Sequence, residues 1–365
     1  MLIQNGFVLE AGASRRVENL KLARNAVDIS AAGSVVMPGF VDSHTHLLYP
    51  PPGARFAPNL EAISGVRLEM QARLHLEAMA RHGTTTVEVK TGSGNESSER
   101  KLLRVLSRLR GRPLEVVSTL DLSLPDSPVE ARAWVDSAST EFLHKVRRSG
   151  LAAFVDIDCV DGAAAFNAQR RYLEAARASG LGLKVHAGEK FAFGAVELAL
   201  EYGAVSVDHL EGAGPLEISL LAKSRTTATV LPAWSLHNNR RYAPARGLVD
   251  AGCAIALATN FNPRHTPTLS MQMVIMLACS QMRLTPAEAI AAATINGAHA
   301  LGRAAEIGSL ECGKSADVLV LNISDYRELG RQCGANLVRL AMRRGQLIYE
   351  EGEVGPRPVS SLAYS

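Results

Sequence analysis

The chain has 365 residues, a formal net charge of +3 at pH 7 and an apolar fraction of 47%. This length allows a large core, and one α/β barrel can occupy about 250 residues. The basic residues are dispersed, which argues against nucleic-acid binding, and no apolar run reaches the roughly 18 residues of a membrane span. Five scattered cysteines and the lack of a visible secretory signal predict reduced thiols and a cytoplasmic protein.

Strand-like and helix-like segments alternate along the chain. The first predicted strand is the apolar run from Val35 to Val41. Seven further short runs rich in β-branched residues are predicted as strands: Thr84–Lys90, Leu114–Leu120, Ala153–Cys159, Leu183–His186, Val205–His209, Thr227–Leu231 and Cys253–Thr259. Amphipathic segments predict helices between them: Gly65–His82, Glu96–Leu109, Glu130–Ser149, Ala164–Ser179 and Ala195–Tyr202. This alternation over eight strands predicts an α/β fold, a (β/α)8 TIM-like barrel.

The two ends of the chain do not continue this pattern. Residues 1–37 and 306–365 carry short apolar patches separated by turn residues, which is typical of strand–turn–strand units. We expect these two segments to pair into one small β-sandwich domain, and residues 38–305 to form the barrel. Near the end of the barrel, Thr285 followed by Pro286 predicts the start of a helix.

Two histidines directly follow the first predicted strand. His44 and His46 are two residues apart, so their side chains point to the same side of an extended chain and can face one metal ion. Imidazole suits Zn, Fe, Ni or Cu better than Mg or Ca. Such pairs also arise by chance, so the spacing alone leaves a metal site and a structural role both open. His186 and His209 also stand where strands end, and barrel active sites lie at these ends.

Several motifs along nearly the whole chain are similar to those of one enzyme family. They are His44-Thr-His46, Val87-Glu-Val-Lys90, Lys184-Val-His186-Ala-Gly-Glu189, Asp208-His-Leu-Glu211, Leu231-Pro232 and Ala258-Thr-Asn-Phe-Asn-Pro263. With them the chain resembles the amidohydrolase superfamily, and within it the imidazolonepropionase branch. The resemblance implies a barrel enzyme that uses one divalent metal ion, Zn or Fe.

The resemblance also implies a ligand set for that metal. His44, His46 and His186 match three histidine ligands of the family, and Asn260 stands where the family has a ligand aspartate. Asparagine offers a neutral carbonyl oxygen and an NH₂ group, so it cannot accept the proton of an attacking water. Loss of a general base typically costs a factor of about 10²–10⁴ in rate. Asn260 is therefore the most consequential departure from the family.

Further residues are assigned roles by the same resemblance. His209 and Glu189 match family residues that move protons, and either is a candidate catalytic acid and base. Asn262 matches a substrate-contacting asparagine, Arg55 matches a carboxylate-binding arginine after a two-residue shift, and Ser93 stands near the place of a missing tyrosine. Glu189 could equally be an exposed carboxylate and Arg55 a surface residue. We expect Lys90, at the end of the second strand, to be structural.

These assignments predict a metal-dependent hydrolase that opens a non-peptide C–N bond in a small cyclic amide or amidine. Because several substrate-facing residues of the family are absent, we expect poor turnover of 4-imidazolone-5-propanoate. Two alternatives stay open: a catalytically impaired small-molecule binder, favoured by Asn260, and a deaminase of the same superfamily. The expected partner is a small-molecule substrate, with no nucleic acid or membrane, and a homodimer is the assembly common in the family.

Overall fold

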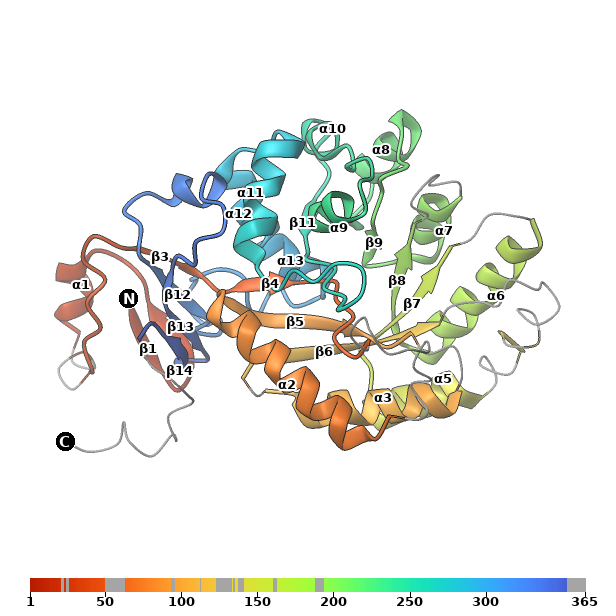
Figure 1. Ribbon diagram of the computed structural model, residues 1–365, viewed down its shortest axis with the longest axis horizontal. Coiled ribbons are helices and arrows are strands. Elements are labelled where there is room, and N and C mark those ends of the chain that lie inside the picture. The colour runs from red at the N-terminus through yellow and green to blue at the C-terminus, as the bar shows by residue number, and fades with distance from the viewer. Residues whose placement is uncertain are drawn as a thin grey trace.

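Eight parallel strands form the central sheet of the computed structural model, which describes residues 1–20, 23, 26–49, 63–92, 96–111, 113–122, 133, 135–136, 141–159, 163–187 and 194–352 (Figure 1). Each strand pairs with the one before it in the chain, in the order β11-β10-β9-β8-β7-β6-β5-β4. The strands are β4 (Phe40–Asp42), β5 (Thr84–Lys90), β6 (Glu115–Leu122), β7 (Phe154–Asp158), β8 (Gly182–His186), β9 (Ser206–Asp208), β10 (Thr227–Val230) and β11 (Ile255–Leu257). The predicted barrel is confirmed.

Helices surround this sheet on its outer side (Figure 1). They are α2 (Gly65–Arg81), α3 (Glu96–Leu109), α5 (Leu143–Ser149), α6 (Ala163–Ser179), α7 (Ala195–Tyr202), α8 (Pro215–Ala222), α9 (Pro232–His237), α10 (Ala245–Asp250), α11 (Met271–Met282), α12 (Pro286–Ala292) and α13 (Ile295–Ala300). Helix α2 shows the common pattern, because Leu68, Ala72 and Leu76, four residues apart, are all buried. No helix in the described ranges combines the length and apolarity that crossing a membrane requires.

The barrel closes between β4 and β11 through contacts beyond a regular strand ladder. The buried carboxyl group of Asp42 accepts hydrogen bonds from the Thr259 backbone N–H at 3.0 Å and from Thr259 Oγ1 at 2.6 Å. The His46 backbone N–H donates to the Phe261 carbonyl at 2.7 Å. These bonds hold the residues that follow β4 beside the residues that follow β11.

A smaller β unit lies beside the barrel (Figure 1). Its antiparallel sheet has the order β14-β13-β12-β3, and a separate hairpin pairs β1 with β2. Val8 of the hairpin shares an apolar core with Val318, Val320, Leu340 and Met342 of the sheet. The elements outside the barrel are β1 (Leu2–Gln4), β2 (Phe7–Glu10), α1 (Ser14–Glu18), β3 (Val35–Pro38), β12 (Val318–Leu321), a 3₁₀ helix (Tyr326–Gly330), β13 (Val338–Arg343) and β14 (Gln346–Glu350).

The prediction of one strand from Val35 to Val41 was wrong. The run is divided at Gly39, with β3 in the small antiparallel sheet and β4 in the barrel. A Cβ atom at Gly39 would lie 2.2 Å from Thr85 Oγ1, so only glycine permits this close approach as the chain passes between sheets. The apolar pattern continues across the break, although only β4 is fully buried and Met37 is the one buried residue of β3.

Most other predicted elements agree with the structure. Strand β5 and helices α3 and α7 have the predicted bounds. The helix start at Thr285 is confirmed, since Thr285 Oγ1 accepts from the Glu288 N–H at 3.3 Å and the Glu288 carboxylate accepts from the Thr285 N–H at 2.8 Å. Part of the predicted helix Glu130–Ser149 lies outside the described residues, and its described part contains α5.

Candidate metal centre

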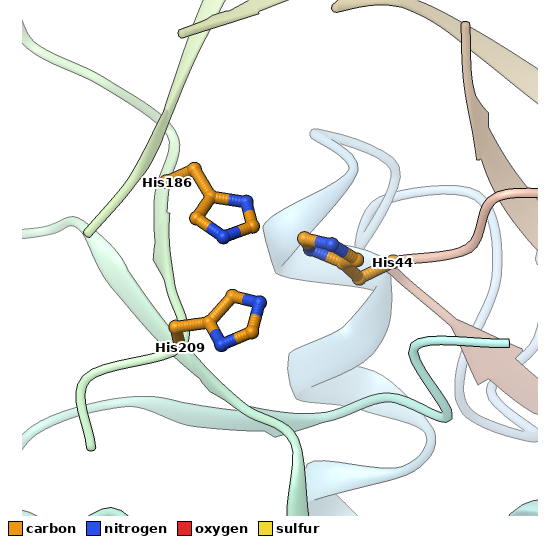
Figure 2. Close-up of side chains that lie close together, drawn as sticks. All are labelled: His44, His186 and His209. Atoms are coloured by element: carbon orange, nitrogen blue, oxygen red, sulfur yellow. The ribbon is translucent and has the colours of Figure 1, made fainter. Parts of the chain in front are cut away.

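Three histidines from different strands converge at the carboxyl end of the barrel (Figure 2). His44 follows β4, His186 ends β8 and His209 follows β9. One ring nitrogen from each lies within 4.8 Å of the corresponding atoms of the other two. The His186 and His209 rings are side by side, with centroids 4.0 Å apart, and His44 faces them from the other side (Figure 2).

The backbone of His209 explains how this ring reaches the centre. In an extended strand, Asp208 and His209 would point to opposite faces. His209 instead has φ +77° and Leu210 has φ +69°, an uncommon left-handed conformation for residues other than glycine. The turn brings the His209 ring centroid to 5.7 Å from that of His44, while Asp208 also points into the barrel and contacts His44. Asp208 and His209, although adjacent in the chain, therefore both lie at the same site.

The hydrogen bonds of His44 leave one ring nitrogen directed at the centre. Its Nδ1 lies 2.7 Å from Asp208 Oδ2, and a carboxylate at that place accepts the Nδ1 proton. Its Nε2 is buried and has no hydrogen-bond partner among the described residues. The same holds for Nδ1 of His46. Buried ring nitrogens without partners are costly, and a metal ion would satisfy them.

Burial keeps these imidazoles neutral. Burial, and after it the positive charge of Lys90, lowers the pKa of His44 and of His46 well below the usual value. Burial and the neighbouring His209 lower the pKa of His186 from 6.5 to about 4. Neutral imidazole is the form that donates a lone pair to a metal, so the site is prepared for binding at neutral pH.

His46 and Asn260 are the other two predicted ligands. The His46 ring centroid is 5.2 Å from that of His44, but His46 is not one of the three histidines whose nitrogens all lie within 4.8 Å. Asn260 follows β11 by three residues and is buried. Its φ of +50° is a left-handed conformation that asparagine and aspartate tolerate better than most residues. The predicted ligand set stays a prediction.

Comparison with known proteins identifies the family. The profile described as Amidohydrolase family matches residues 35–338. The imidazolonepropionase of Symbiobacterium thermophilum is 39% identical over 360 residues, covering 90% of this chain and 84% of the relative. That of Geobacillus kaustophilus is 36% identical over 384 residues, covering 96% of this chain and 90% of the relative. The chain belongs to the amidohydrolase family.

Solved structures agree on the fold of this amidohydrolase. A zinc-bound adenosine deaminase from Xanthomonas campestris has a TM-score of 0.71 at 19% identity and covers 99% of this chain and 90% of its own. Atrazine chlorohydrolase from Arthrobacter aurescens complexed with zinc has a TM-score of 0.76 at 18% identity, with coverages of 96% and 90%. At these identities the likeness is one of fold. The predicted metal-dependent, imidazolonepropionase-like hydrolase is confirmed at the level of the family.

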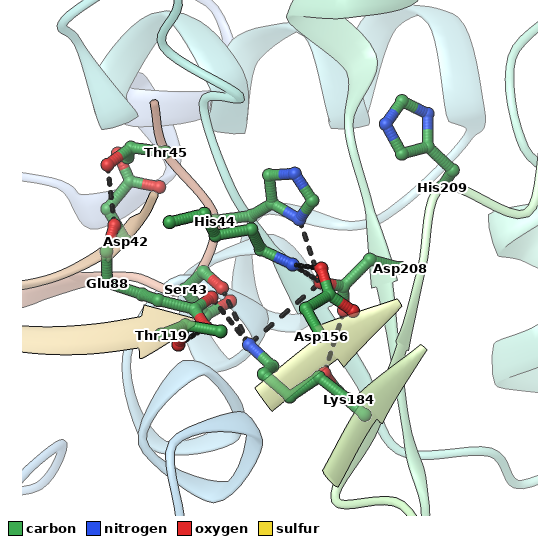
Figure 3. Close-up of polar contacts among 12 residues, drawn as sticks. Asp42, Ser43, His44, Thr45, Glu88, Thr119, Asp156, Lys184, Asp208 and His209 are labelled. Carbon is green, nitrogen blue, oxygen red and sulfur yellow. Dashed lines mark hydrogen bonds and ion pairs between the residues drawn. The ribbon is translucent and has the colours of Figure 1, made fainter. Parts of the chain in front are cut away.

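Beneath the histidines, the interior of the amidohydrolase barrel carries buried ion pairs (Figure 3). Lys90 Nζ contacts the carboxylates of Asp156 and, at 2.7 Å, Asp208. Lys184 Nζ lies 2.5 Å from Glu88 Oε2. These five side chains are fully buried or nearly so, which requires them to be paired. The expected structural role of Lys90 agrees with this arrangement.

Charges in this group act on one another. Burial alone would lower the pKa of Lys90, but Asp156, Asp208 and Glu88 together raise it well above its usual value. Burial alone would raise the pKa of Asp208, but Lys184, Lys90 and the bond to His44 hold it well below its usual value. Asp208 is therefore a carboxylate at neutral pH, as its bond to the His44 Nδ1–H requires.

Of the four other predicted site residues, the structure describes only Asn262. Glu189, Arg55 and Ser93 lie outside the described residues, so their roles stay predictions. Asn262 is buried, and its Oδ1 accepts a hydrogen bond from the Arg264 N–H at 2.9 Å. This bond shapes the turn that contains Asn262 and engages one of its side-chain acceptors.

Sequence reasoning missed Asp208 as the partner of His44. The sequence does contain an indication, because Glu88 and Lys90 alternate on β5 and Asp208 is the charged residue at the end of β9. Charged residues at alternate positions of buried barrel strands point into the barrel, where they need partners. The pairing itself depends on which strands face each other across the barrel, and the sequence does not state it.

Proposed function

We propose that this amidohydrolase uses one Zn or Fe ion to hydrolyse a non-peptide C–N bond in a small cyclic amide or amidine. The observation that carries the proposal is the convergence of ring nitrogens of His44, His186 and His209 within 4.8 Å, with His46 beside His44 and with the buried His44 Nε2 unpartnered among the described residues. A protein that only folds gains nothing from bringing several buried imidazoles to one point.

The donor set fits a borderline-soft divalent ion. His44, His46 and His186 would hold it through imidazole nitrogens, the ligands that suit Zn and Fe, and Asn260 is the fourth ligand that the resemblance implies. When bound, such an ion polarises a carbonyl group and lowers the pKa of water to about 7. Asp208 fixes the tautomer of His44, so Nε2 presents its lone pair without rearrangement.

His209 is the described residue best placed to move protons. Its Nδ1 lies 3.1 Å from Glu211 Oε2, which orients the ring and favours a proton on Nδ1. Proton transfer with substrate would then use Nε2, first accepting a proton from water and afterwards returning it to the leaving nitrogen. Glu189 remains the alternative proton carrier that the resemblance implies.

Asn260 favours a second candidate function, a small-molecule binder with impaired catalysis. Its amide has no proton-accepting capacity and no negative charge, so both turnover and metal affinity should fall below those of an aspartate site. Retention of the imidazoles favours the enzyme over the binder. We also propose that the protein works in the cytoplasm, because all five cysteines are free thiols.

Hydrolysis by protein loaded separately with Zn(II) and with Fe(II) tests the proposal, using a panel of cyclic amides and amidines that includes 4-imidazolone-5-propanoate. We expect turnover of at least one compound and poor turnover of 4-imidazolone-5-propanoate. His209→Ala should reduce the rate about 10²–10⁴-fold, whereas His144→Ala, an exposed histidine on α5, serves as the control and should not. Full activity of His209→Ala would exclude the proton-transfer role, and efficient turnover of 4-imidazolone-5-propanoate would overturn the substrate prediction.

A further inference from the structure

Asp208 accepts hydrogen bonds from three side chains of the barrel interior, and Figure 3 shows the one from His44. Its Oδ2 accepts from His44 Nδ1 and from Lys90 Nζ, both at 2.7 Å. Its Oδ1 accepts from Ser206 Oγ at 2.7 Å. A carboxylate with both oxygens engaged has little freedom to rotate, so the direction of its bond to the His44 ring is defined.

Two buried lysines lie close to this carboxylate but differ in what they contact. Lys90 donates directly to Asp208 and also pairs with Asp156, and these three residues come from the alternate strands β5, β7 and β9. Lys184 Nζ is 3.9 Å from Asp208 Oδ2 and donates instead to Glu88 and to the Ser43 carbonyl. Both ammonium groups are fully buried, so each supplies charge, but only Lys90 supplies a hydrogen bond to Asp208.

We propose that Lys90 is a positioning residue for the metal centre: its hydrogen bond to Asp208 orients the carboxylate that aims the His44 ring at the metal. The inference rests on the proposed function, because it takes His44 as a ligand. Lys90 acts through Asp208 and His44, so two side chains stand between it and the ion. Both lysines supply positive charge, but only Lys90 also fixes the orientation of the Asp208 carboxylate.

The consequence of removing Lys90 follows from the contacts it leaves behind. Without its ammonium group, the carboxylates of Asp156 and Asp208 face one another in a water-poor interior with no cation between them. Asp208 then turns away or takes up a proton, and in either case the His44 Nδ1–H loses a well-directed acceptor. Loss of such an outer partner of a metal-ligating histidine typically weakens metal binding about 10–100-fold.

Lys90→Met and Lys184→Met form a matched pair for the test, because both remove a fully buried lysine of the same barrel. Zn(II) affinity is measured on metal-free protein by competition with a chromophoric chelator. We expect Lys90→Met to weaken binding about 10–100-fold and Lys184→Met to weaken it less than about tenfold. Equal losses in the two variants would show that charge alone matters and would overturn the proposal.

A second readout needs no metal at all. In metal-free protein, the His44 Nδ1 proton in its bond to Asp208 should give a strongly downfield ¹H resonance coupled to the ring ¹⁵N. We expect the resonance to move upfield or vanish in Lys90→Met and to persist in Lys184→Met. An unchanged resonance in Lys90→Met contradicts the inference. The wild type could show the resonance, and Lys90→Met lose it, while the wild type binds no Zn(II). In that case the proposed function would be wrong, but the positioning of Asp208 by Lys90 would be supported.

Should Lys90→Met fail to fold, the double variant Lys90→Met/Asp156→Asn removes the opposing charge together with the lysine. Its partner Lys184→Met/Glu88→Gln makes the same change around the other lysine. We expect only the first double variant to lose the His44 resonance and the tight Zn(II) binding. Retention of both in that variant would overturn the proposal.

Discussion

Asp42→Asn tests how the barrel is closed next to the metal centre. Asp42 is fully buried, and both of its oxygens accept hydrogen bonds from Thr259, which joins the end of β4 to the end of β11. Burial raises the pKa of Asp42 from 3.8 to about 7, in spite of the bonds from Thr259, so the folded protein prefers the protonated acid. Asparagine has nearly the same shape as that acid and carries no charge to desolvate.

The size of the effect follows from linkage. Because the folded-state pKa lies above the unfolded value, the contribution of Asp42 to stability is fully present below about pH 4. It is lost as the pH rises to about 7, where the folded protein also ionises. A shift of about 3 pKa units at about 1.4 kcal/mol each is worth about 4 kcal/mol. Relative to wild type, Asp42→Asn should therefore gain about 4 kcal/mol between pH 4 and pH 7.

Urea unfolding of metal-free wild type and Asp42→Asn at intervals from pH 4 to pH 8 measures this difference. Taking the difference between the two proteins cancels the titration of all other groups that the substitution leaves unaffected. We expect nearly equal stabilities at pH 4, a growing advantage for the variant above pH 4, and a constant difference above pH 7. A difference that is independent of pH would show that Asp42 has an ordinary pKa in the folded protein.

Three further substitutions give separate expectations. Asn260→Asp should raise turnover by up to about 10²–10⁴-fold and tighten Zn(II) binding if the site is otherwise competent, and no gain in either assay would show that more than this residue is missing. Gly39→Ala should lower the free energy of unfolding by about 1–3 kcal/mol, because the new methyl group meets Thr85, whereas Gly12→Ala, whose nearest atom is 3.8 Å away, should leave it nearly unchanged. Equal thermal midpoints for these two glycine variants would contradict the close approach at Gly39.

The difference in free energy of unfolding between metal-free wild type and metal-free His186→Asn should depend on pH. The folded-state pKa of His186 is lowered from 6.5 to about 4, so the unfolded chain binds the extra proton between these values. Wild type should lose about 3 kcal/mol relative to the variant as the pH falls from 6.5 to 4. Parallel stability curves from chemical denaturation would show that His186 has an ordinary pKa in the folded protein.

The barrel itself could be predicted because its strands and helices are long, periodic and locally consistent. Strand β5 and helix α3 carry this signal clearly enough that their predicted bounds match the structure. The break at Gly39 could not be predicted, because it depends on the close approach of Thr85, a residue distant in the sequence. The sequence pattern of an apolar run is the same whether the run forms one strand or two strands in different sheets.

At the site, the positions of His44 and His186 could be predicted from the order of the strands, but those of His209 and Asp208 could not. His44 and His186 stand at strand ends and meet as expected. His209 reaches the group through a left-handed backbone turn that residue spacing does not reveal. The partnership of Asp208 with His44 and Lys90 joins strands that are far apart in the chain, so it became visible only when the barrel was assembled.

The metal content of the purified protein is the measurement that decides whether these histidines form a metal site. Elemental analysis of protein purified without chelators should find close to one Zn or Fe per chain, because the histidines present buried nitrogens that no described residue satisfies. Metal-free protein that also fails to bind added Zn(II) would contradict the account, and the small-molecule binder would then be the better description of this amidohydrolase.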